Sequence, residues 1–93
     1  MKGYMIFYVT TANGSVPLGE ARVRVAVQGN LKEAVTDKEG KTAPIEFCFF
    51  DEHPSLTGSA EISCDNFKDM FLDDIMIYRN TTIVRIVNLD RVI

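Results

Sequence analysis

Apolar and polar side chains alternate one by one along residues 21–25, and this alternation is the clearest structural signal in the chain. The apolar positions are Ala21, Val23, Val25 and Val27, and the polar positions are Arg22, Arg24 and Gln28. Successive side chains of a β-strand point to opposite faces of its sheet. The pattern therefore predicts a strand with one face in a core and the other in water.

Seven segments have the composition and spacing of strands, and turn residues separate most of them. They are residues 4–11, 21–27, 31–36, 42–50, 58–65, 74–79 and 82–89. The sequence predicts a turn at Asn13-Gly14 and a left-handed Gly40. Pro44 should lie at the start or edge of its strand, because proline donates no ladder hydrogen bond.

Two stretches between these segments have no strand pattern of their own. Residues 51–58 form a polar connector long enough to cross between sheets, and residues 66–72 read as irregular or as a single helical turn. No apolar pattern of period 3.6 runs for the roughly 10–12 residues that a helix needs. The fold class predicted is all-β: a seven-stranded antiparallel Greek-key β-sandwich.

Length, charge and hydropathy restrict the partners. A chain of 93 residues is expected to form a single domain over residues 1–93.

A net charge of −3 argues against a nucleic-acid partner, because binding nucleic acid requires a basic surface. The apolar run at residues 5–9 is too short for a signal peptide or a membrane span. We expect no membrane insertion and a cytoplasmic location, with non-classical delivery to a surface left open.

The two cysteines are expected to lie in different environments. Cys48 falls on the more polar face of its strand, whereas Cys64 alternates with the apolar Ala60 and Ile62. Free thiols are therefore favoured over a disulfide, and free thiols fit a reducing compartment.

Several turn and packing motifs together resemble one known family. They are Tyr8-Val9-Thr10-Thr11 with Gly14, Val16-Pro17-Leu18, Ala21 with Val23 and Val25, Thr36-Asp37 with Gly40 and Thr42, and Ile62 and Cys64 before Asn66-Phe67. The chain resembles carboxypeptidase regulatory-like domains, which are transthyretin-like (prealbumin-like) sandwiches. The family has a glycine where Asn66 stands, and asparagine tolerates the same left-handed backbone. The resemblance implies a stand-alone bacterial member of a family of folding supports, spacers and interaction modules.

Searches for catalytic or ligand-binding chemistry yield no site. The single histidine, His53, is read as an exposed loop residue, and Asp65, Asp69, Asp73 and Asp74 as a solvated acidic rim. The related purine-degradation hydrolases carry several histidines and a Tyr-Arg-Gly-Ser C-terminus, which this chain lacks. No nucleophile has a convincing base. We therefore expect no enzyme activity, no cofactor and no metal.

The run Phe47-Cys48-Phe49-Phe50 cannot face one core completely, because side chains alternate. Either the connector that follows covers Phe50, or Phe50 forms an exposed patch with Tyr4 or Tyr8. The function predicted is a non-catalytic protein-interaction or assembly module. One alternative is a carbohydrate or cell-wall-glycan-binding module that uses exposed aromatics. Another is a self-assembling structural subunit, because the edge strands of a sandwich can pair.

Overall fold

The computed structural model describes residues 1–49 and 54–92, and these residues form strands and turns. The strands are β1 (Lys2–Thr11), β2 (Val16–Pro17), β3 (Arg22–Val27), β4 (Asn30–Val35), β5 (Ile45–Cys48), β6 (Ser55–Ser63), β7 (Met70–Tyr78) and β8 (Thr82–Asn88). Within the described ranges, no helix is long and apolar enough to cross a membrane. The predicted all-β sandwich is confirmed.

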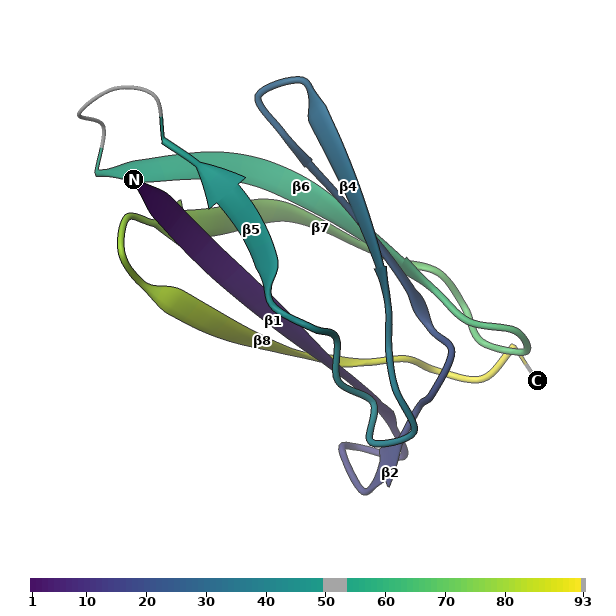
Figure 1. Cartoon of the computed structure of the whole chain (residues 1–93). Helices are drawn as coiled ribbons and strands as arrows, with labels where there is room; N and C mark the ends of the chain where they lie inside the picture. Colours follow the sequence, from purple (N-terminus) through teal and green to yellow (C-terminus); the bar gives the residue numbers. More distant parts are fainter. Residues whose placement is uncertain (50–53, 93) are drawn as a thin grey trace.

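The strands form two sheets that pack face to face (Figure 1). In sheet A, β1 is central, with β8 on one side and β5 and the short β2 on the other. Sheet B has the order β4-β3-β6-β7. The chain passes from sheet A to sheet B between β5 and β6, which is the crossing expected of the connector there.

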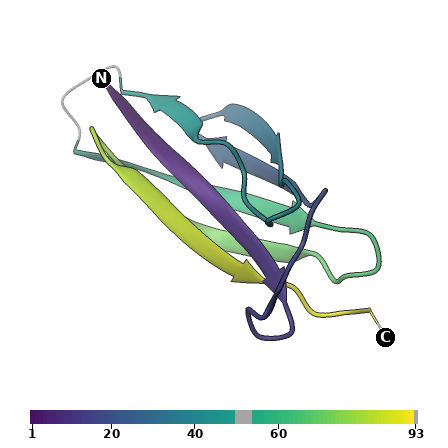
Figure 2. The same ribbon diagram turned by 60° about the horizontal axis from the view of Figure 1, so that its bottom comes forward.

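One ladder differs from the antiparallel pairing predicted for the whole molecule. Strands β1 and β8 run parallel, with Tyr4 opposite Thr82 and Thr10 opposite Asn88, whereas all other pairs of the described strands are antiparallel. Figure 2 shows β8 beside β1 at the margin of the sandwich. The first and last strands of the chain thus meet in one sheet.

The core lies between the sheets and follows the predicted alternation. The three valines of β3 are fully or almost fully buried, whereas Arg22, Arg24 and Ala26 on the other face are exposed. In β1, Met5, Phe7 and Val9 provide the matching inner face of sheet A. Further along the chain, Ile45, Phe47 and Phe49 are buried, as the alternation in that segment predicts.

Turn positions also agree with the sequence. Gly40 and Asn66 have positive φ angles of 80° and 74°, so asparagine does occupy a left-handed position after β6. Gln28 and Gly29 both have positive φ and form the two-residue turn of the β3–β4 hairpin. Pro44 immediately precedes the edge strand β5, where its missing N–H costs no ladder bond.

The largest difference between prediction and structure concerns residues 70–73. These belong to β7, although the sequence pattern indicates irregular structure as far as residue 72. A register shift between Gly58 and Ala60 interrupts the β6–β7 ladder. At this shift the consecutive residues Asp73 and Asp74 of β7 are both exposed. Two consecutive exposed residues interrupt the alternation that identifies a strand. Strand β6 also begins earlier than predicted, at Ser55, and β2 adds an eighth strand.

Side-chain contacts close the margin of the sandwich between β4 and β5. The Lys32 ammonium of β4 donates a hydrogen bond to the Glu46 carbonyl of β5. Its nitrogen also lies 5.5 Å from the centroid of the Phe47 ring, within cation–π range.

Backbone hydrogen bonds hold the C-terminal end of the described chain. The Lys68 N–H donates to the Asp90 carbonyl, and the Val92 N–H donates to the Asn66 carbonyl.

Candidate interaction surfaces

Five large side chains form a contiguous surface on the outside of sheet A, here called the sheet A face. Tyr4, Ile6 and Tyr8 come from β1, and Val84 and Ile86 come from β8. The parallel register places Ile6 opposite Val84 and Tyr8 opposite Ile86. Ile86 is 70% exposed and Val84 is 55% exposed, so the apolar character of this face increases toward β8.

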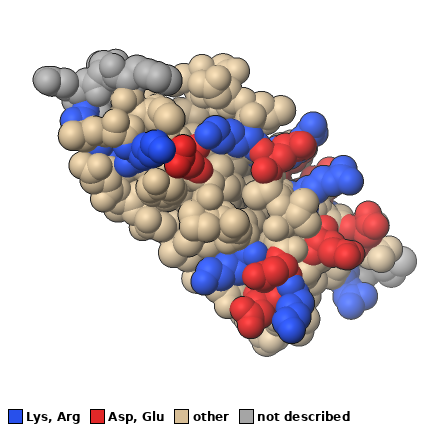
Figure 3. Space-filling model, viewed as in Figure 1, with Lys and Arg blue, Asp and Glu red and all other residues tan. Residues whose placement is uncertain are grey.

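Charged side chains lie at the borders of the sheet A face and are absent from its centre. Figure 3 shows a stretch of surface over β1 and β8 without Lys, Arg, Asp or Glu. At one border, the Lys2 Nζ lies 3.3 Å from Glu46 Oε1, and the hydrogen bond to Glu46 raises the pKa of Lys2. The Tyr4 hydroxyl donates to the same carboxylate over 3.5 Å.

The structure brings two of the three predicted patch residues together. Tyr4 and Tyr8 both lie on the sheet A face, where Tyr4 is half-buried and Tyr8 is 36% exposed. Phe50 and His53 lie outside the described residues. Sequence reasoning missed Ile6, Val84 and Ile86, although β8 has apolar residues on both faces, the same signal that drew attention to residues 47–50.

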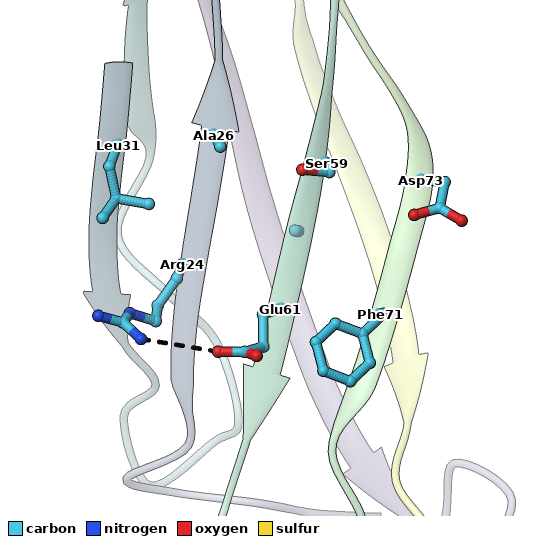
Figure 4. Close-up of a pocket in the computed structure, with 8 residues that line it drawn as sticks. Arg24, Ala26, Leu31, Ser59, Glu61, Phe71 and Asp73 are labelled. Atoms are coloured by element: carbon cyan, nitrogen blue, oxygen red, sulfur yellow. Dashed lines mark ion pairs between the residues drawn. The ribbon is translucent and has the colours of Figure 1, made fainter. Parts of the chain in front are cut away.

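The outside of sheet B has a different chemistry. A shallow hollow of about 330 Å³ is lined by residues of all four strands, among them Arg24, Leu31, Ser59, Glu61, Phe71 and Asp73. Figure 4 shows Leu31 and Phe71 on opposite sides of the Arg24–Glu61 pair. The Arg24 Nε lies 2.7 Å from Glu33 Oε1, and Nη1 lies 3.7 Å from Glu61 Oε1. This face therefore mixes exposed apolar groups with a fixed charge network.

The remaining candidate residues do not form one cluster. Asp65, Asp69, Asp73 and Asp74 are exposed, and the last two belong to β7 rather than to a loop. Across residues 1–49 and 54–92, no three His, Cys, Asp or Glu side chains are grouped closely enough to hold a metal ion.

The cysteines lie in different environments, as predicted. Cys48 is exposed, Cys64 is half-buried against the core, and neither is in a disulfide. Burial, and secondarily the charge of Asp65, raise the pKa of the Cys64 thiol. A raised pKa disfavours the reactive thiolate, so Cys64 is a poor nucleophile.

Comparison with solved structures identifies the same fold in another protein. The chain is similar to a chain of a type II cohesin–X-dockerin complex from Acetivibrio cellulolyticus, an interface mutant, with a TM-score of 0.56 and 17% sequence identity. The match covers 92% of this chain and 56% of that chain, so this chain spans just over half of its length. No protein-family model and no curated protein sequence matches. At this identity the likeness establishes the β-sandwich fold alone.

Proposed function

We propose that this chain is a non-catalytic protein-interaction or assembly module that binds another protein surface through the sheet A face. The observation that carries the proposal is the register of Ile6 with Val84 and of Tyr8 with Ile86, which merges separate apolar residues into one uncharged surface. Single exposed apolar residues are ordinary, whereas contiguous apolar patches with polar borders mark interaction sites. Similarity to a chain from a protein–protein complex is consistent with this role.

The finer assignment that we propose is membership of the carboxypeptidase regulatory-like family. The left-handed backbone of Asn66, at the position of the family's glycine, supports it. We also propose a cytoplasmic location, which the free thiols of Cys48 and Cys64 support. Fractionation of the cells that produce the protein tests the location. The free thiols are labelled before the cells are completely lysed. Recovery in an extracellular fraction would contradict it.

Site-specific photocrosslinking tests the interaction directly. A photoreactive phenylalanine analogue replaces Tyr8 on the sheet A face or, as the matched control, Phe71 on sheet B; both side chains are exposed aromatics. We expect adducts of defined mass from position 8 in the producing cells, suppressed by excess unlabelled protein, and none from position 71. Absence of a saturable adduct at position 8 would refute the proposed function.

A specific observation also favours a second candidate, glycan binding at the sheet B hollow. Phe71 is 63% exposed, and Ser59, Glu61 and Asp73 surround the same hollow with hydrogen-bonding oxygens. An apolar ring beside such oxygens suits a sugar, which has an apolar ring face and hydroxyl edges. Retention on purified cell-wall glycan should then be lost in Phe71→Ala and kept in Tyr8→Ala. Equal retention of both variants, or none by the wild type, would exclude this candidate.

A further inference from the structure

We infer that the sheet A face continues into a second copy of this chain, through antiparallel pairing of β8 with β8 across a two-fold axis. This inference rests on the proposed function and names a partner, which pairs along the β8 edge of that face. It starts from the backbone of β8, whose outer edge is the margin of sheet A in both ribbon views (Figures 1 and 2).

Hydrogen bonds at the two ends of the β1–β8 ladder show which backbone groups are free. The Tyr4 N–H donates to the Thr81 carbonyl, and the Leu89 N–H donates to the Thr10 carbonyl. Odd-numbered residues of β8 therefore direct their N–H and C=O toward β1, because these directions alternate along a strand. Thr82, Val84, Ile86 and Asn88 direct theirs to the outer edge, where the described residues offer them no backbone partner.

The other edge strands of the described chain are better protected against such pairing than β8. Strand β4 has Lys32 and Glu33, and β7 has Asp73 and Asp74. Strand β5 has four residues and follows Pro44, and β2 has two residues, one of them proline. Charges, prolines and short length are the usual means of blocking edge pairing. Strand β8 has seven residues and one charge, Arg85, whose half-buried side chain points away from the sheet A face.

The sequence of β8 selects a second copy and a register. Centring the pair on Arg85 would place two like charges directly opposite, which is unfavourable. Centring it on Ile86 places Ile86 against Ile86, Val84 against Asn88 and Arg85 against Val87. In this register the edge-directed groups of residues 84, 86 and 88 form about six interchain hydrogen bonds. Ile86, the most exposed large apolar side chain among the described residues, then lies on the axis.

This symmetry also limits the assembly to two copies. A two-fold interface uses the same surface on both subunits, so pairing consumes both β8 edges and leaves the protected edges outside. The two sheet A faces become one continuous face, with Tyr8 and Ile86 of each copy flanking the axis.

Sedimentation velocity over a hundred-fold concentration range tests the association. We expect a monomer–dimer equilibrium that Ile86→Lys weakens at least about tenfold, because it removes apolar contact and places two like charges at the axis. Leu31→Lys is the matched control, since Leu31 is 60% exposed on the edge strand β4 of the other sheet. Its association should equal that of the wild type. A wild type that remains monomeric throughout would overturn the inference.

Cysteine crosslinking tests the register in a background in which Cys48→Ser and Cys64→Ser remove the native thiols. Facing residues of a hydrogen-bonded antiparallel pair have Cα atoms roughly 5.5 Å apart, within the range of a disulfide. Ile86→Cys should therefore form a disulfide dimer on mild oxidation, whereas Val84→Cys should not. Thermal melts verify that both variants are folded. A dimer from Val84→Cys alone, or from neither variant, would refute the pairing proposed.

These measurements separate the two proposals. A heterologous adduct at position 8 with a monomeric purified protein would preserve the proposed function and overturn the β8 pairing. A purified dimer whose Ile86→Cys variant crosslinks supports the β8 pairing, whereas only a saturable adduct at position 8 supports the proposed function. Loss of both the adduct and the dimer would overturn both.

Discussion

The buried hydroxyl of Thr36 connects three segments of the chain, and its removal should destabilise the fold measurably. The Ala21 N–H donates to Thr36 Oγ1 over 2.9 Å, and this hydroxyl donates in turn to the Leu18 carbonyl over 2.6 Å. Thr36 is 4% exposed and Ala21 is fully buried, so water cannot replace the bond between them. The hydroxyl thus fixes the chain where it leaves β2 for β3.

Replacing Thr36 with valine keeps the shape and removes both bonds. A buried donor left without a partner costs about 1–3 kcal/mol. A value near the middle, about 2 kcal/mol, corresponds to a melting temperature lowered by roughly 8–16 °C in a domain of this size. Urea unfolding monitored by circular dichroism measures the free energy, and hydrogen exchange of the Ala21 amide should accelerate specifically.

The matched control is Thr57→Val, on the exposed side of β6. Surface substitutions of this kind usually change stability by less than about 0.5 kcal/mol. If Thr36→Val also remained within about 0.5 kcal/mol of the wild type, with the Ala21 amide still protected, the hydroxyl would not be the connection described here.

Three further outcomes follow from individual residues. Glu20 has a φ of 61°, a conformation that costs a non-glycine residue about 1–2 kcal/mol. Glu20→Gly should therefore stabilise the protein by up to about 1 kcal/mol in urea unfolding. Glu39→Gly, at a turn residue without positive φ, should not stabilise it. A Cβ at Gly3 would lie 2.5 Å from the Tyr78 carbonyl oxygen, so Gly3→Ala should lower the free energy of unfolding by about 1–3 kcal/mol, and an unchanged melting curve would contradict this close approach. Burial raises the pKa of Cys64 and so reduces its thiolate fraction at mildly alkaline pH. Iodoacetamide should therefore modify Cys64 in the Cys48→Ser variant more slowly than it modifies the exposed Cys48 in the Cys64→Ser variant. Equal rates would contradict the raised pKa of Cys64.

The sandwich could be predicted from sequence because its evidence is local. Alternation along residues 21–27 fixes which side chains of β3 are buried, and the turn residues Gly40 and Asn66 specify left-handed positions without reference to the rest of the chain. The start of β7 could not be predicted in the same way. The bulge opposite Gly58 places Asp73 and Asp74 in water together, and it is defined by the pairing of β7 with β6, in which three steps along β7 match two along β6.

The candidate surface was only partly predictable, because it depends on pairing between the two ends of the chain. Tyr4 and Tyr8 are recognisable as outward-facing aromatics, and Val84 and Ile86 as outward-facing residues of the last strand. Nothing local indicates that β1 and β8 are neighbours, that they run parallel, or that Ile86 lies opposite Tyr8. Register is a long-range property, and a shift of one residue would turn these side chains to the other face.

The exposure of these side chains reflects the missing neighbour on one side of sheet A. In β1, which has strands on both sides, the outward-facing Ile6 is half-buried. Its partner Val84, in a strand with a neighbour on one side only, is 55% exposed, and Ile86 is 70% exposed. Side chains of comparable size and hydrophobicity thus differ in burial because of their position in the sheet. A strand added beside β8 would bury Val84 and Ile86 in the way that β8 now buries Ile6, and a second β8, whose one charge at Arg85 points away from the sheet A face, supplies such a strand.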